Sequence, residues 1–147
     1  MARLFSRYFP LVAWLLFISF ASSDNFNASN TSRIIGPLIL WLFPNTSIET
    51  LGLVHLITRK VAHLTEYAIL AFFAARAFRT SPRPSIANHW FLISLAIVVI
   101  YALLDEYHQS FVPSRTGTIY DSLIDIAGGL TALLLIRHRH RPARRFN

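Results

Sequence analysis

The sequence contains no cysteine and only a small share of charged residues. The missing cysteine excludes disulfide bonds and thiolate metal sites, although it carries no information about the compartment. Charged residues occupy 14% of the 147 positions, whereas a typical soluble domain carries roughly 25%. Apolar residues occupy 54%, and the mean hydropathy is +0.46. Because so little polar surface cannot cover a water-soluble globule, we expect a single domain with a lipid-facing exterior.

The sequence also lacks an apolar run of the roughly 20 residues that a clean transmembrane span needs. Four shorter blocks are present instead, at Tyr8–Ala21, Val61–Phe78, Trp90–Leu104 and Leu123–Ile136. Blocks of this length also suit the helices of a soluble bundle. They become full spans if flanking polar residues such as Lys60, Asp105 and Asp121 lie at membrane depth and face other helices.

The distribution of charge decides between these two interpretations. If the helices alternate in direction, the N-terminus, the loop at 79–88 and the C-terminal tail lie on one side of the membrane. Ten of the 14 basic residues then lie on that side, namely Arg3, Arg7, Arg76, Arg79, Arg83, Arg137, Arg139, Arg141, Arg144 and Arg145. The acidic residues fall in the opposite loops or helix halves. This bias predicts an all-α, polytopic membrane protein of about four transmembrane helices, with both termini cytoplasmic.

The net charge of +7 would suggest nucleic-acid binding in a soluble protein. Here the arginines lie in short runs between apolar blocks, which suits the anionic surface of a membrane leaflet. We therefore predict membrane lipids as partners and no nucleic acid.

The segment between the first two spans contains the apolar stretch Ile34–Phe43, which is too short to cross a membrane and includes Pro37. We predict that this stretch is interfacial or re-entrant. Thr46 and Glu49 match a capping box that starts the next helix, which can run unbroken from Ile48 into the second span. The first apolar block also matches a cleavable signal peptide; we favour a retained helix.

Three short strings hold most of the ionisable groups outside the basic loops. In the first, RKVAHLTEY, the residues Lys60, His63 and Tyr67 share one helix face, and Glu66 lies beside them. In the second, DEYHQSFVPSR, Asp105 and Gln109 lie one turn apart. In that string, Glu106 is rotated from Asp105 by about 100°, and Arg115 is the basic residue of the loop that follows.

The third string, YDSLIDIAGG, places Asp121 and Asp125 on one helix face. Gly128 and Gly129 follow one turn later and allow another helix to approach closely. Because the second and fourth spans leave the outer side and the third arrives there, the three strings should meet in the outer half of the bundle. They are expected to form an outward-facing polar pocket there.

The polar residues of these strings are the candidate site. The candidate catalytic residues are His63, Glu66, Asp105 and Asp121, and the candidate ligand-binding residues are Lys60, Tyr67, Glu106, Gln109, Arg115 and Asp125. One alternative is that Lys60 or Arg115 forms purely structural pairs with aspartates. Another is that the tyrosines are mainly anchors of the aromatic belt at headgroup level.

No metal or other cofactor is predicted from the sequence. His63 and Glu66 together with the aspartates could bind a metal, but their positions lack a recognised zinc-binding spacing. A metal site therefore stays an open alternative rather than the prediction.

These strings resemble the VanZ-like family of small bacterial membrane proteins, which is named for a factor of resistance to the glycopeptide teicoplanin. The resemblance rests on Arg59-Lys60-x-x-His63-x-x-Glu66-Tyr67, then Asp105-Glu106-x-x-Gln109-x-x-x-Pro113-x-Arg115, then Asp121-x-x-x-Asp125-x-x-Gly128. It implies one membrane domain over 1–147, with a motif-bearing core at about 59–136 and a basic cytoplasmic tail at 137–147. It also implies the bacterial cytoplasmic (inner) membrane. Asp125 stands where the resistance-factor branch often has asparagine.

Three functions are compatible with this constellation. The favoured one is binding of an anionic lipid headgroup, an envelope precursor or a glycopeptide, with Lys60 and Arg115 as anion contacts and a link to glycopeptide resistance. The alternative is an intramembrane enzyme on a lipid-linked envelope substrate, with His63 as acid/base oriented by Asp105 or Asp121. Proton-coupled transport is disfavoured, because the ionisable groups occupy one half of the membrane and no inverted repeat is present.

Overall fold

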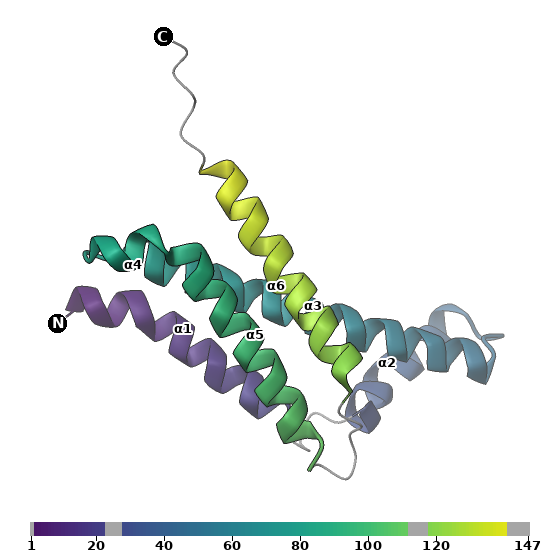
Figure 1. The fold of residues 1–147 in the computed structure, drawn as a ribbon. Coiled ribbons are helices and arrows are strands. Elements are labelled where there is room, and N and C mark those ends of the chain that lie inside the picture. The colour runs from purple at the N-terminus through teal and green to yellow at the C-terminus, as the bar shows by residue number, and fades with distance from the viewer. Residues whose placement is uncertain (1, 23–27, 112–117, 141–147) are drawn as a thin grey trace.

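The chain is mainly helical in the part that the computed structural model describes, residues 2–22, 28–111 and 118–140. The helices are α1 (Ala2–Ala21), α2 (Ala28–Leu42), α3 (Ile48–Arg79), α4 (Pro84–Asn88), α5 (Trp90–Gln109) and α6 (Ile119–Arg139) (Figure 1). This architecture confirms the predicted all-α fold.

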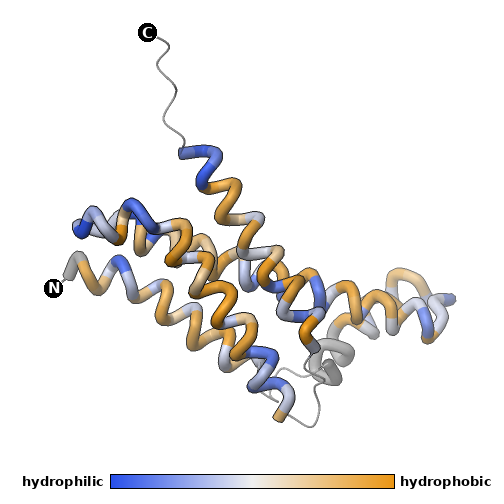
Figure 2. The backbone as a smooth tube through the Cα atoms, viewed as in Figure 1, coloured by the Kyte–Doolittle hydropathy of each residue, from blue (hydrophilic) through white to orange (hydrophobic). Residues whose placement is uncertain are grey.

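Four of these helices, α1, α3, α5 and α6, are long and apolar enough to cross a membrane. They reach this length because the polar residues that flank the apolar blocks are helical, as predicted: Lys60 lies within α3, Asp105 within α5 and Asp121 within α6. Figure 2 shows apolar residues along the helices and hydrophilic ones mainly at their ends and near the crossing of α3 with α6. The chain is a multi-pass membrane protein.

The described side chains are not distributed as in a water-soluble protein. Large apolar side chains such as Leu16 (66% exposed), Leu92 (62%) and Leu135 (61%) face outward. The carboxylate of Asp125 and the amide of Gln109 are completely buried. An apolar exterior around a partly polar interior suits a hydrocarbon solvent, in which ionisable groups avoid lipid by facing other helices.

Helix α3 is the centre of the bundle, because it contacts α1, α2, α5 and α6, most extensively α6. Its buried face is rich in alanine, which allows neighbouring helices to come close. At the crossing with α6, a methyl group on Gly128 would overlap the backbone of Leu64, and one on Gly129 would overlap Val98. The prediction that these two glycines permit close packing is therefore confirmed.

Helix α2 has 15 residues, includes Pro37 and packs against α3. It is too short to belong to the four candidate spans. Helix α3 then begins at Ile48 and runs without a break to Arg79, as predicted. The predicted capping residue was wrong by one position: the cap is Ser47, whose Oγ accepts a hydrogen bond from the Thr50 amide at 3.2 Å.

Helix α1 packs against α3 and α5 through hydrogen bonds as well as apolar contacts. The indole Nε1 of Trp14 donates to the carbonyl oxygen of Glu66 at 2.9 Å. The hydroxyl of Tyr101 donates to the carbonyl oxygen of Leu15 at 2.5 Å. Leu11 and Ile18 are buried on the same side of the helix. Cleavage after the first apolar block would remove all of these contacts.

Candidate functional site

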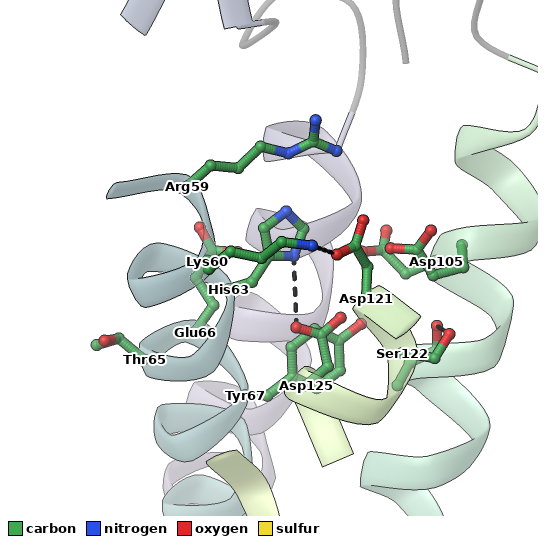
Figure 3. Close-up of polar contacts among 12 residues, drawn as sticks. Arg59, Lys60, His63, Thr65, Glu66, Tyr67, Asp105, Asp121, Ser122 and Asp125 are labelled. Carbon is green, nitrogen blue, oxygen red and sulfur yellow. Dashed lines mark hydrogen bonds and ion pairs between the residues drawn. The ribbon is translucent and has the colours of Figure 1, made fainter. Parts of the chain in front are cut away.

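The three polar strings meet where the end of α5 and the start of α6 pack against α3 (Figure 3). We refer to six side chains as the polar cluster: Lys60 and His63 from α3, Asp105 and Gln109 from α5, and Asp121 and Asp125 from α6. All of them except Lys60 are buried. The predicted convergence of acids and bases from separate segments is therefore confirmed, whereas the roles of the individual residues remain predictions.

The first contact of the polar cluster is an ion pair between Lys60 Nζ and Asp121 Oδ1, which joins α3 to α6. The two side chains differ in exposure, with 33% for Lys60 and 9% for Asp121. Lys60 therefore lies at the solvent-accessible edge of the cluster, and its ammonium group compensates a carboxylate that is nearly out of reach of water.

The second contact joins the same two helices one turn further in. His63 Nδ1 lies 3.4 Å from Asp125 Oδ1. We expected Asp105 or Asp121 to orient His63, but Asp121 is paired with Lys60 instead. Among the described residues, neither carboxylate oxygen of Asp125 accepts a hydrogen bond. A fully buried carboxylate in this state is costly unless a cation compensates its charge.

The third contact is a chain of hydrogen bonds from α5 to α3. Gln109 Nε2 donates to Asp105 Oδ2 at 3.0 Å, which confirms that these two residues share a helix face. Gln109 Oε1 in turn accepts a bond from Arg59 Nη2 at 3.4 Å. Within the described part of the chain, Arg59 has no carboxylate at salt-bridge distance.

Arg59 was missing from the residues proposed for the site. A signal for it was present in the sequence, because Arg59 lies one helical turn before His63 in the first string. Its guanidinium group lies at the edge of the polar cluster, above Lys60 and His63 in the view of Figure 3. Arg115, which we expected to be the anion contact, lies outside the described residues.

Glu106 connects the end of α5 to the start of α6 through a hydrogen bond. Its Oε2 accepts a hydrogen bond from the backbone amide of Thr118 at 2.7 Å. Thr118 is the N-cap of α6, and its own hydroxyl accepts from the Asp121 amide at 3.3 Å. Ser122 reinforces this junction, because its hydroxyl donates to the carbonyl oxygen of Ala102 at 3.3 Å. These bonds fix the height at which Asp121 enters the polar cluster.

Two further predicted residues, Glu66 and Tyr67, follow His63 along α3. Tyr67 is completely buried, and its hydroxyl donates to the carbonyl oxygen of Tyr101 at 3.3 Å. The alternative that the tyrosines anchor an aromatic belt therefore does not apply to Tyr67. Glu66 is half-buried, and its backbone carbonyl accepts the bond from Trp14. Both residues connect the polar cluster to the apolar core.

The similarity of the chain to known proteins identifies its family. The family model described as VanZ/LLP1 matches residues 7–140, which is nearly the whole chain. The chain belongs to this family. The resemblance of the three polar strings is thereby confirmed. No curated protein and no solved structure matches the chain.

Two surface hollows of this VanZ/LLP1 protein lie away from the polar cluster. One is formed where α2 meets the start of α3, and it is lined by Ile39, Leu42, Phe43, Pro44, Asn45, Thr46, Ser47, Thr50 and Val54. The other lies near the end of α6, between Thr131 and His138. The outward-facing polar pocket therefore stays a prediction.

Three side chains of types that can ligate a metal lie together within the polar cluster. One nitrogen of His63 and one oxygen each of Asp105 and Asp125 all lie within 4.8 Å of one another. The three residues come from three helices, so that spacing along the sequence does not reveal the set. All three side chains are buried.

Proposed function

We propose that this VanZ/LLP1 protein binds the anionic headgroup of an envelope lipid or lipid-linked precursor at the edge of the polar cluster. The observation that carries the proposal is the state of Arg59. Its guanidinium group donates to the neutral amide oxygen of Gln109 and has no carboxylate at salt-bridge distance within the described residues. A guanidinium group of this kind can hold a phosphate through two parallel hydrogen bonds.

The surroundings of Arg59 support a lipid rather than a soluble anion. Lys60, which is next to it, adds a second partly exposed cation. Apolar side chains of α3, α5 and α6 near the same level are exposed, namely Leu56, Ile57, Val61, Leu103, Leu104, Ile119, Tyr120 and Leu123. Acyl chains would cover these side chains while the headgroup reaches the two cations.

The proposed location is the outer leaflet of the bacterial cytoplasmic (inner) membrane, with both termini in the cytoplasm. Support comes from the basic residues at the end of the bundle opposite the polar cluster. Arg76 Nη1 donates to the carbonyl oxygen of Ser6 at 3.4 Å, and Arg137 lies 5.1 Å from the centre of the Phe91 ring. The start of α1, the end of α3 and the end of α6 thus lie at the same end of the bundle, and each carries arginines. Arginines favour the cytoplasmic side of a membrane.

Retention of phosphatidylglycerol tests headgroup binding. The full-length protein is reconstituted into phosphatidylcholine nanodiscs that contain a minor fraction of phosphatidylglycerol, is then extracted with detergent, and the lipid bound per chain is counted by mass spectrometry. Loss of a charge-assisted hydrogen bond costs about 1.5–3 kcal/mol, so Arg59→Gln should weaken retention about tenfold or more. Arg83→Gln is the matched control, because Arg83 is exposed at the opposite end of the bundle. Equal retention by both variants would refute the proposed site.

Resistance to glycopeptides is the cellular role proposed for the same site, supported by the resemblance of the three strings. A teicoplanin-susceptible host that expresses the protein should tolerate more drug than the host alone. Arg59→Gln should abolish this gain, and Arg83→Gln should preserve it. Unchanged susceptibility of the host that expresses the wild-type protein would exclude the resistance role and leave lipid binding to its own test.

A second candidate function is an intramembrane acid/base enzyme on a lipid-linked envelope substrate. The observation in its favour is the 3.4 Å distance between His63 Nδ1 and Asp125 Oδ1, because a carboxylate can fix the orientation of an imidazole that transfers a proton. Envelope lipids from cells with the wild-type protein should then contain a product that cells with folded His63→Gln lack. Identical lipid profiles would exclude the enzyme and leave binding as the function.

A further inference from the structure

We infer that the VanZ/LLP1 protein binds a divalent first-row metal ion between His63, Asp105 and Asp125. One ligand atom from each of these side chains lies within 4.8 Å of the other two. Three ligands around one ion lie roughly 3.3–3.8 Å apart when each metal–ligand distance is about 2.0–2.2 Å. Side-chain movements of less than about 1 Å would therefore close the site.

The charge and hydrogen bonding of Asp125 point to a cation independently of this geometry. Its side chain is completely buried, and neither carboxylate oxygen accepts a hydrogen bond from the described residues. His63 Nδ1, at 3.4 Å from Asp125 Oδ1, is likewise buried without a hydrogen-bond partner there. Two carboxylates and a neutral imidazole carry the charge that balances a divalent ion, so metal binding would satisfy all three groups at once.

The residues around the three ligands resemble the supporting groups of a metal site. Gln109 donates to Asp105 Oδ2 at 3.0 Å and so fixes the orientation of one ligating carboxylate. Lys60 engages Asp121, which leaves that carboxylate outside the ligand set. Supporting hydrogen bonds of this kind set ligand orientation and affinity in metal sites.

The ligand set favours a transition metal over calcium or magnesium. Carboxylates alone would suit hard cations such as calcium, magnesium and manganese, whereas imidazole suits zinc, iron, copper and nickel. Because the three ligands belong to α3, α5 and α6, the ion would also join the three helices that form the polar cluster.

Mn²⁺ alone is the probe for the test, because it binds most weakly in the divalent series and so competes least for exposed histidines such as His138. The full-length protein is purified in detergent, stripped with a chelator and titrated, and free Mn²⁺ is followed by electron paramagnetic resonance. We expect one Mn²⁺ per wild-type chain. His63→Gln and Asp105→Asn should each weaken binding by more than roughly 100-fold, and Gln109→Leu by about 10–100-fold.

Two exposed residues provide matched controls. His138→Gln removes an imidazole and Glu49→Gln removes a carboxylate, both outside the polar cluster. Both variants should bind Mn²⁺ like the wild type. A wild-type protein that binds neither Mn²⁺ nor, in a parallel titration, Zn²⁺ overturns the inference without any variant. Folded His63→Gln and Asp105→Asn proteins that bind the ion as tightly as the wild type would overturn it as well. The titration contains no anionic lipid, so its result is independent of the headgroup proposal and of the Arg59→Gln measurement.

Discussion

Lys60 and Asp121 form an ion pair in which the two partners depend on each other unequally. The Lys60 side chain is 33% exposed, so its ammonium group can reach water or headgroups without Asp121. The Asp121 side chain is only 9% exposed and depends on Lys60 for compensation of its charge. Removal of one partner of a buried pair leaves the other charge uncompensated, and the cost is set by the burial of the residue that remains.

Lys60→Met should therefore destabilise the protein more than Asp121→Asn. We expect a loss of about 3 kcal/mol in the free energy of unfolding for Lys60→Met, because it leaves a buried carboxylate unpaired. For Asp121→Asn we expect roughly 1 kcal/mol, close to that of an exposed pair. Denaturant titration in detergent gives both values. The double variant should recover part of the loss of Lys60→Met, and the opposite ranking of the two single variants would contradict this account.

Residue spacing predicted which side chains share a helix face, but it could not predict their partners. Asp105 and Gln109 form the expected contact within one helix. The pairing of Lys60 with Asp121 and of His63 with Asp125 depends on the height at which α6 packs against α3, which the glycines and the Thr118 cap determine. Arg59 was overlooked because its contact with Gln109 crosses between helices.

At the scale of the helices, the crossing of α3 with α6 depends on Gly128. A side chain there would collide with the backbone of Leu64, which cannot move without displacing α3. Gly52 lies on α3, and a side chain at this position would meet open space. The two glycines therefore provide a comparison between a packing role and none.

Gly128→Ala should destabilise the protein by about 1–3 kcal/mol, the usual cost of an overpacked interior. Gly52→Ala should be neutral or stabilise it by up to about 1 kcal/mol, because alanine favours the helix more than glycine does. The free energy of unfolding of each variant, measured in the same detergent, tests the pair. A neutral Gly128→Ala would show that α6 does not pack this closely.

The presence of each spanning helix and the start of α3 at Ile48 could be predicted, but the apolar blocks alone do not give the helix ends. The apolar blocks of the sequence stop where the polar strings begin, whereas the helices continue through those strings. They can continue because Asp105 and Asp121 are buried against other helices instead of facing lipid. The cap of α3 was misplaced by one residue because Thr46 bonds to the carbonyl oxygen of Phe43 and Ser47 takes its role.

The orientation proposed for the protein in the membrane rests on the positions of the arginines, and it is testable because the chain has no cysteine. Ser110, next to the polar cluster, and Ser85, on α4 at the other end, are both exposed. In intact cells, a maleimide that does not cross membranes should label Ser110→Cys and leave Ser85→Cys unlabelled. Lysis should expose both, and the reverse pattern in intact cells would invert the proposed topology.

Helix α3 differs from its neighbours in length, with 32 residues against 20 in α5 and 21 in α6. At 1.5 Å per residue it is about 48 Å long, whereas the hydrocarbon core of a bilayer is about 30 Å thick. It crosses α6 and continues past the ends of α5 and α6 toward α2 (Figure 1). Where the apolar side chains of α3 exceed the hydrocarbon thickness, tilt relieves the mismatch. A thicker bilayer should draw α3 upright and change its angle to α6, so the acyl-chain length of the surrounding lipids becomes a variable that adjusts the polar cluster.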